Sequence, residues 1–99
     1  MPRAKRQVNT LTDIPNIGPR SAEDLVRIGI TRPEQLAGED GIALYRKLCR
    51  VDGVRHDPCV ADAFMAAVDY MNGAPKQDWW WYTPRRKELM SEARTKKRR

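Results

Sequence analysis

The chain has 99 residues, two cysteines and a formal net charge of +6, which its ends supply because residues 11–83 carry a charge of −3. This length allows one small domain with a single core, and its folded body cannot hold a polyanion by bulk charge. The sequence lacks the ~20 consecutive apolar residues of a membrane span and shows no secretion signal, so we expect a cytoplasmic protein with reduced thiols and no membrane partner.

Residues 11–30 predict two helices joined by a tight turn. The first is a short helix that follows a flexible basic segment of residues 1–8. The turn spans Pro15–Gly18, in which Asn16 and Gly18 are the residue types that tolerate a positive φ. The second helix opens at Pro19, where proline is favoured because its missing N–H would be unpaired anyway.

This turn is expected to aim several backbone N–H groups at one point. The first amides of a helix have no partner within the helix, and the helix dipole adds positive charge there, so such a turn forms an anion site. A phosphate group is the expected ligand of this site. The predicted phosphate donors are the backbone or side-chain groups of Asn16, Gly18, Arg20 and Ser21, assisted by Arg27 and Arg55.

The pattern from Leu11 to Leu25 resembles the helix-hairpin-helix motif of non-sequence-specific DNA-binding proteins. Asn16 stands where that family usually has its first turn glycine. The resemblance implies contact with the DNA backbone, and it implies that hairpin carbonyls can bind a monovalent cation. The carbonyls that correspond here are those of Thr12, Ile14 and Ile17. The alternative is a hairpin that serves only to pack helices.

Three further helical segments follow the hairpin. Thr31 and Glu34 match a capping box, in which the acid three residues on closes the start of a helical turn. Asp40 caps a helix expected to run from Gly41 to Val51. The next helix begins with the acid at N-cap and proline at N1, at Asp57-Pro58, and its apolar stripe ends before Asn72-Gly73.

The segment after the Gly41–Val51 helix weakly repeats the hairpin. Residues 51–54, followed by a helix, echo residues 14–17, with Arg55 and His56 standing where the first turn has Gly18 and Pro19. This favours a degenerate second hairpin. Two consecutive helix pairs without common ancestry would give the same pattern.

Cys49, His56 and Cys59 raise the question of a metal site. Structural zinc sites usually show two close ligand pairs, whereas this spacing contains one, so we disfavour metal binding and expect no metal. Cys59 lies in the first turn of a helix, where a thiolate would be favoured and redox chemistry is conceivable. Packing of small buried thiols is the commoner role.

Four consecutive aromatic residues, Trp79, Trp80, Trp81 and Tyr82, precede the C-terminal helix. No regular geometry points three consecutive indoles at one core, so we expect one or two to pack and another to be partly exposed. These residues can hold the C-terminal segment against the core, form a protein or homodimer surface, or stack on nucleic acid. Thr83-Pro84 then begins a helix with three cations in its first turn, which suits a nearby anion.

Most of the chain, from Leu11 to about Lys87, resembles the bacterial pathogenicity-locus family of helix-hairpin-helix proteins, some of which carry a mitomycin-resistance label. More distantly, it is similar to the C-terminal domain of competence regulators of the TfoX type. The matching pieces are Leu11–Ile30, Leu44-Tyr45 with Leu48-Cys49, Asp57–Val60 and Trp79–Thr83.

Enzyme activity is not expected. Glycosylases of the helix-hairpin-helix superfamily use a hairpin lysine, and its position aligns with Arg20, whose guanidinium stays protonated and cannot act as a nucleophile. Asp40 lies near the distance of their aspartate, but a helix cap explains it better. The chain is also too short for the second domain that holds a flipped base.

The sequence therefore predicts an all-α, compact four- or five-helix bundle. Its expected parts are the basic segment 1–8, a helix-hairpin-helix domain 9–73, a Trp-rich segment with the C-terminal helix 74–93, and a disordered basic tail 94–99. The leading functional hypothesis is a DNA-binding or DNA-associated module that contacts backbone phosphates without sequence specificity. The alternative is a protein-interaction or homodimerisation module that uses Trp79–Tyr82. No cofactor is expected beyond the hairpin cation.

Overall fold

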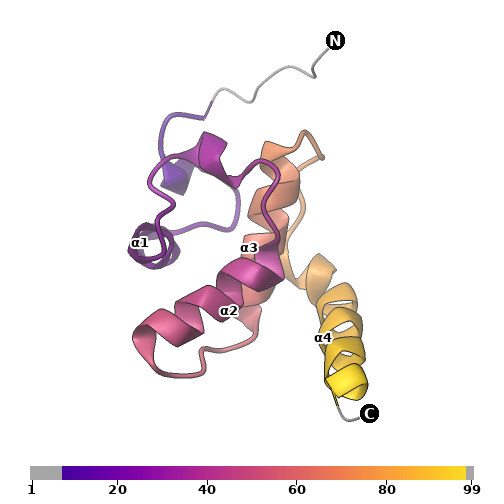
Figure 1. Ribbon diagram of the computed structural model, residues 1–99. Helices are drawn as coiled ribbons and strands as arrows, with labels where there is room; N and C mark the ends of the chain where they lie inside the picture. The colour runs from indigo at the N-terminus through magenta and orange to yellow at the C-terminus, as the bar shows by residue number, and fades with distance from the viewer. Residues whose placement is uncertain (1–7, 98–99) are drawn as a thin grey trace.

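The computed structural model describes residues 8–97, with side chains from residue 8 to residue 91 (Figure 1). Within this range every regular element is helical, so the all-α prediction is confirmed. The elements in chain order are η1 (Leu11–Asp13), α1 (Pro19–Arg27), η2 (Pro33–Leu36), α2 (Gly41–Asp52), α3 (Cys59–Met71), η3 (Trp79–Tyr82) and α4 (Thr83–Lys97), where η marks a 3₁₀ turn. None of the described helices is long and apolar enough to cross a membrane.

Side-chain caps set the ends of the two central helices. Asp40 Oδ1 accepts the N–H groups of Ile42 and Ala43, at 2.9 and 3.3 Å, and begins α2 as expected. Gly53 ends α2 in the left-handed conformation, with φ 69°. The Asp57 carboxylate accepts the Cys59 N–H at 2.9 Å, although α3 begins one residue later than predicted.

The capping box predicted at Thr31–Glu34 is wrong by one residue in both members, because the N-cap of η2 is Arg32 and the third residue is Gln35. Gln35 Oε1 accepts the backbone N–H groups of Thr31 and Arg32, at 2.7 and 2.8 Å. Glu34 instead pairs with the Arg32 side chain at 3.0 Å. Because η2 is a 3₁₀ turn beginning at Pro33, its third residue is Gln35, and that side chain reaches back to the start of the turn.

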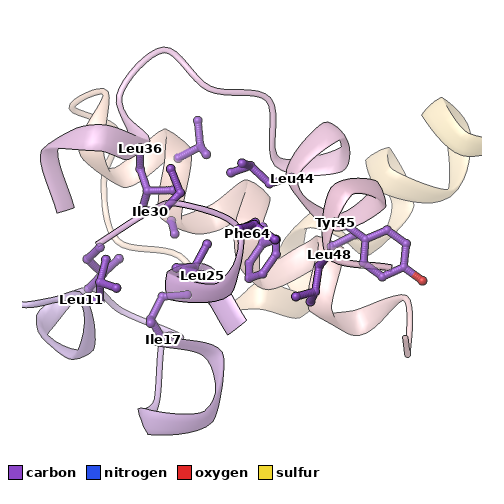
Figure 2. Packing of buried hydrophobic residues seen from close by; sticks show 14 residues of the cluster. Leu11, Ile17, Leu25, Ile30, Leu36, Leu44, Tyr45, Leu48 and Phe64 are labelled. Atoms are coloured by element: carbon purple, nitrogen blue, oxygen red, sulfur yellow. The ribbon is translucent and has the colours of Figure 1, made fainter. Parts of the chain in front are cut away.

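Helices α2 and α3 form the centre of the molecule and pack against each other more extensively than any other pair of described elements. Gly41 allows this approach, because a Cβ there would lie 2.6 Å from the Cα of Met65. Around this pair, one continuous core includes residues from η1, α1 and η2, with Phe64 fully buried among them (Figure 2). The labelled members are Leu11, Ile17, Leu25, Ile30, Leu36, Leu44, Tyr45, Leu48 and Phe64.

Helix α4 is attached to α3 by a buried carboxylate. Asp62 is 0% exposed and accepts the Thr83 hydroxyl at 2.6 Å and Arg86 Nε at 2.9 Å. The three cations in the first turn of α4 suggested a nearby anion, and for Arg86 that anion is internal to the protein. Figure 1 shows α1 and α4 on opposite sides of the α2–α3 pair.

The C-terminal boundary differs from the prediction. Helix α4 continues to Lys97, which extends helical backbone into the range 94–99 that the sequence suggested was a disordered tail. Residues 98–99 lie outside the described residues, as do residues 1–7 of the expected flexible N-terminal segment. Val8, the last residue of that segment, packs against the core.

Candidate functional site

The hairpin turn between η1 and α1 is closed by one backbone hydrogen bond. The Ile17 N–H donates to the Ile14 carbonyl at 3.1 Å, and Asn16 adopts the predicted left-handed conformation with φ 73°. Gly18 does not need its conformational freedom, because its φ of −88° and ψ of −175° suit any residue. What Gly18 provides is space, since a Cβ there would meet nothing within 4 Å.

The N-terminus of α1 has no side-chain cap. Among the described residues, the backbone N–H groups of Asn16, Gly18, Arg20 and Ser21 have no hydrogen-bond acceptor, while the Ala22 N–H donates to the Gly18 carbonyl at 2.9 Å. By contrast, carboxylates accept amides at the starts of α2 and α3. The first turn of α1 therefore presents unpaired donors beside the exposed surface of Gly18.

The Asn16 side chain joins the hairpin turn to the tryptophan segment. Its Nδ2 donates to the Gln77 carbonyl at 2.6 Å, and its Oδ1 accepts the Trp79 N–H at 3.1 Å. A glycine in this place would allow the same turn but make neither bond. The departure from glycine is visible in the sequence, but the bridge it makes across 63 residues is not.

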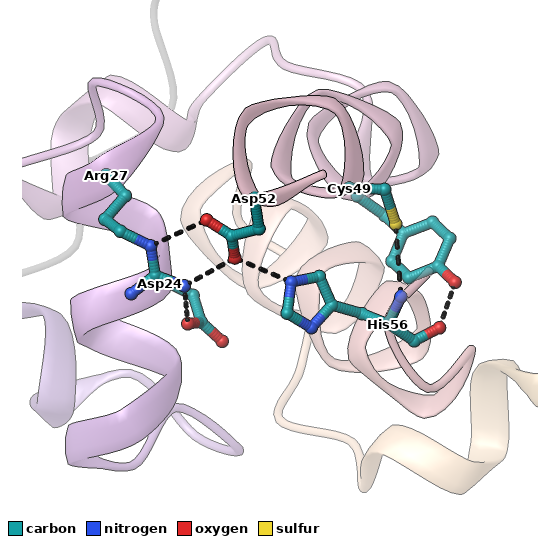
Figure 3. A network of polar contacts seen from close by, with 6 residues as sticks. Asp24, Arg27, Cys49, Asp52 and His56 are labelled. Atoms are coloured by element: carbon teal, nitrogen blue, oxygen red, sulfur yellow. Dashed lines mark hydrogen bonds and ion pairs between the residues drawn. The ribbon is translucent and has the colours of Figure 1, made fainter. Parts of the chain in front are cut away.

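Arg27, predicted to assist at the phosphate, is held by two carboxylates (Figure 3). Its Nη2 contacts Asp24 at 2.7 Å and Asp52 at 2.8 Å, and its Nε donates to Asp52 at 3.1 Å. Hydrogen bonds from Arg27 first, and then from His56, lower the pKa of Asp52. The same carboxylates raise the pKa of Arg27. This arrangement leaves Arg20 as the exposed cation without a carboxylate partner at the hairpin, among the described residues.

His56 extends this network to the loop between α2 and α3. Its Nε2 lies 2.7 Å from Asp52 Oδ2, its N–H donates to Cys49 Sγ at 3.4 Å, and its carbonyl accepts the Tyr45 hydroxyl (Figure 3). The predicted second turn is therefore connected to α1 through Asp52 and Arg27. Gly53 in this second turn is left-handed, as Asn16 is in the first.

A surface hollow of about 780 Å³ lies between α1 and this loop. It brings the predicted residues Arg20 and Ser21 together with Arg27 and His56. The charge of its wall is mixed, because three acids contribute to it. The full lining is Pro19, Arg20, Ser21, Glu23, Asp24, Arg27, His56, Asp57 and Val60.

Arg55 does not share that hollow. It lines a smaller one, of about 160 Å³, with the first turns of α4, beside Arg86 and Lys87. The predicted phosphate ligands thus fall into two groups, one at the α1 start and one where the α2–α3 loop meets α4.

The cysteines do not have the environment expected of a reactive thiol. Cys59 is exposed, so the expected role of a small buried thiol is wrong for this residue. A hydrogen bond to Asp57 is the main cause that raises the pKa of Cys59, which opposes the thiolate predicted from its place at a helix start. Cys49 is half-buried and packs against the core. Within the described residues, no three His, Cys, Asp or Glu side chains are grouped as metal ligands.

All three tryptophans are exposed, which differs from the expectation that one or two would pack. Trp79, Trp80 and Trp81 have exposed fractions of 37%, 59% and 57%, whereas Tyr82 is buried. A 3₁₀ turn explains this order, because residues i and i+3 eclipse and Trp79 shares the inward side with Tyr82. Burial and then a hydrogen bond to Asp69 raise the pKa of Tyr82 to about 12.

The carbonyls expected to bind a cation belong to the hairpin but differ in their bonding. The Ile14 carbonyl already accepts the Ile17 N–H. Those of Thr12 and Ile17 accept no hydrogen bond from the described residues. They retain the lone pairs that an oxygen-coordinated cation requires.

Comparison with known proteins covers most of the chain. Residues 4–88 match the model of the family described as "Pathogenicity locus". A curated relative from Streptomyces lavendulae, "Mitomycin resistance protein McrB", is 43% identical over 81 residues, which cover 82% of this chain and 77% of the relative. No solved structure matches the chain.

Proposed function

We propose that this chain, which belongs to the pathogenicity locus family, is a small DNA-binding module. In this proposal the turn between η1 and α1 is a helix-hairpin-helix motif that holds backbone phosphates without reading sequence. We also propose that the chain is distantly related to the C-terminal domain of TfoX-type competence regulators. The observation that supports it most is the uncapped start of α1, with unpaired amides at Gly18, Arg20 and Ser21.

The chemistry of the site suits a phosphate group. Backbone donors at a helix start act together with the helix dipole on an anion. The Arg20 side chain is exposed beside them and can add a charge-assisted contact. Such contacts fix position on a duplex but carry no base information, so binding without sequence preference follows.

The remaining predicted cations have secondary roles in this proposal. Arg27 organises the loop after α2 and reaches a phosphate only by giving up a carboxylate. Arg55 adds charge near Lys87 at a second place on the surface. We propose no reaction, because Arg20 cannot form a Schiff base and, among the described residues, no hydrogen bond joins Ser21 to His56 although both line the hollow beside it.

The test is a Gly18→Val variant titrated against fluorescently labelled duplex DNA at low salt. The backbone of Gly18 suits valine and the added atoms enter open space, so the fold is retained while a phosphate is blocked. We expect a loss of affinity of at least about tenfold, equivalent to about 1.4 kcal/mol. Ala37→Val, at an exposed residue of extended backbone, is the matched control. Equal affinity of the two variants would overturn the hairpin site.

The relative's name links the proposal to a phenotype. We propose that the chain contributes to mitomycin resistance through its DNA contact. Cells expressing the natural chain should survive mitomycin better than cells expressing Gly18→Val at the same protein level. Equal protection by both chains would show that resistance does not depend on the hairpin contact.

A monovalent cation in the hairpin is a related proposal. Binding of K⁺ or Na⁺ by the Thr12, Ile14 and Ile17 carbonyls would stiffen the turn before it meets DNA. Replacing K⁺ by tetramethylammonium at constant ionic strength should then weaken duplex binding by the natural chain. Unchanged affinity would remove the cation from the proposal.

The second candidate function is a protein-interaction or homodimer module. The exposure of three consecutive indoles at Trp79–Trp81 favours it. Light scattering of the natural chain and of Trp80→Ala tests self-association. A dimer mass that Trp80→Ala reduces to that of a monomer would support this function.

A further inference from the structure

We infer that the exposed indoles of η3 stack on unpaired nucleobases, so the DNA bound by this protein contains a single-stranded stretch. The inference rests on the proposed function, because it names the substrate class of the same interface. It uses two features that the hairpin does not explain, namely the exposed tryptophans and the charge of α4.

The indoles are arranged as separate platforms. In a 3₁₀ turn successive side chains point about 120° apart, so Trp80 and Trp81 face different directions. Trp81 packs against the buried ring of Tyr82, with centroids 5.1 Å apart and planes at 73°, which restrains the indole while 57% of Trp81 stays exposed. Divergent rings make a poor flat patch for a protein partner, but each offers a face to one base.

The charge next to the indoles favours a polyanion as the occupant. Helix α4 begins directly after η3, and its first turns contain Arg85, Arg86 and Lys87 against Glu88, while Asp78 is the one acid directly before the indoles. Of the cations in its first turn, Arg86 is neutralised by Asp62, while Arg85 and Lys87 are exposed. A second copy of the chain would bring an equally basic helix towards this one. A nucleic acid strand supplies both phosphates for the cations and bases for the rings.

The indoles also have a fixed relation to the hairpin. Asn16 in the turn bonds the backbone at Gln77 and Trp79, immediately before the exposed rings. A strand whose phosphate lies at the α1 start can therefore continue towards η3. Bases paired in a duplex are already stacked and face inward, so only unpaired bases can reach the rings.

The experiment compares three ligands of matched length on the full chain. They are a thymine oligomer, an abasic oligomer with the same phosphates but no bases, and a duplex. Affinity is read by anisotropy of a labelled strand, and quenching of tryptophan fluorescence reports stacking directly. We expect the thymine oligomer to bind more tightly than the abasic one and to quench the indoles.

Variants assign the effect to residues. Trp80→Ala and Trp81→Ala should each weaken binding of the thymine oligomer by about 5- to 150-fold, the effect typical of losing one stacked base. Both should leave the affinity for the abasic oligomer unchanged. Val54→Ala is the matched control, because Val54 is also a large exposed hydrophobic residue, with 56% exposed.

The outcomes separate the two proposals. Equal binding of thymine and abasic oligomers overturns the stacking inference, as does a loss on Trp80→Ala that is the same for all three ligands. Reduction of a dimer to monomers by Trp80→Ala, without effect on DNA, also overturns it and identifies a second copy as the occupant. The hairpin proposal is tested separately. It fails if the Gly18→Val variant binds the duplex and the abasic strand as tightly as the natural chain does.

Discussion

Asn16 combines a backbone conformation with a tertiary role. Its φ of 73° places it in the left-handed region, which costs other L-residues about 1 kcal/mol. Its carboxamide then donates to Gln77 and accepts from Trp79, so both of its polar ends are used. This residue therefore shapes the hairpin turn and fixes the segment that presents the tryptophans.

Replacing Asn16 separates these roles. Asn16→Gly keeps the left-handed backbone but loses two hydrogen bonds, and we expect it to lower the free energy of unfolding by about 1–2 kcal/mol. Asn16→Ala should lower it by about 1 kcal/mol more, through backbone strain. Urea unfolding measures both. Asn16→Gly with unchanged stability would show that the bridge to Gln77 and Trp79 contributes nothing.

Two glycines show the opposite sensitivity to an added methyl group. Gly41→Ala places a Cβ 2.6 Å from backbone atoms of Met65, so α2 and α3 must separate. We expect a loss of about 1–3 kcal/mol in the free energy of unfolding. Gly18→Ala meets open space and should change it by no more than about 0.5 kcal/mol. Equal effects in thermal unfolding would contradict the described helix packing.

Among the elements, α1 is attached to the α2–α3 pair partly by ion pairs. Asp52, the last residue of α2, accepts from Arg27 of α1 and lies 2.7 Å from His56 Nε2 in the following loop. One carboxylate thus fixes the orientation of the hairpin helix and of the loop before α3. The charges of Arg27 and Asp52 hold α1 and the loop after α2 together, so neither charge is freely available to a ligand.

The lowered pKa of Asp52 makes this attachment depend on pH. A carboxyl whose folded pKa lies below its ordinary value of 3.8 stabilises the fold above that value and loses the effect as pH falls through the folded pKa. We therefore expect the natural chain to be more stable than Asp52→Asn near pH 6, with the difference shrinking below pH 4. Thermal unfolding of both proteins across pH 2–6 measures it. A difference independent of pH would exclude the ionised carboxylate as its source.

The attachment of α4 rests on a buried pair. Arg86→Leu leaves the carboxylate of Asp62, which is 0% exposed, with only the Thr83 hydroxyl. Removing one partner of a buried ion pair typically costs about 3–5 kcal/mol, and we expect a loss of that order in urea unfolding. Lys87→Leu, at an exposed neighbour, is the control. The double variant Asp62→Leu with Arg86→Leu should recover part of the loss, because no unpaired charge remains.

At the scale of the whole molecule, charge is segregated. Residues 11–83 carry a net charge of −3, whereas residues 84–99 carry +6. Among the described residues of this body, ion pairs join Arg27 to two aspartates and Arg32 to Glu34. A polyanion is therefore attracted by the ends and held, in our proposal, at one local place on the body.

Truncation after Ala93 tests this division. It removes five cations, so we expect weaker duplex binding at low salt. The slope of log K against log salt should also become smaller, by about 0.9 for each phosphate that the truncated chain no longer neutralises. The truncated chain should still lose affinity on Gly18→Val. If it no longer responds to that substitution, binding resides in the tail alone.

Local sequence determined the helices and most of their ends. Asp40, Gly53 and Pro19 act through bonds and steric limits within a few residues, so their effects could be predicted from sequence alone. The helical class and the pathogenicity locus family were likewise predicted, and both are confirmed. The start of α1 has no side-chain cap because Gly18 at N-cap and Pro19 at N1 provide no side-chain acceptor, and the role of its amides as phosphate donors stays a prediction.

Tertiary structure alone decided which side chains remain available to a ligand. The sequence alone gives Arg27 and Arg86 no long-range partner. In the fold, Arg27 pairs with a carboxylate 25 residues away and Arg86 with one 24 residues away. Asn16 meets Trp79 across 63 residues, and the exposure of the indoles depends on a 3₁₀ turn that places Tyr82 inward. Such pairings depend on how helices pack, and a sequence pattern with a reach of three or four residues does not contain that distance information.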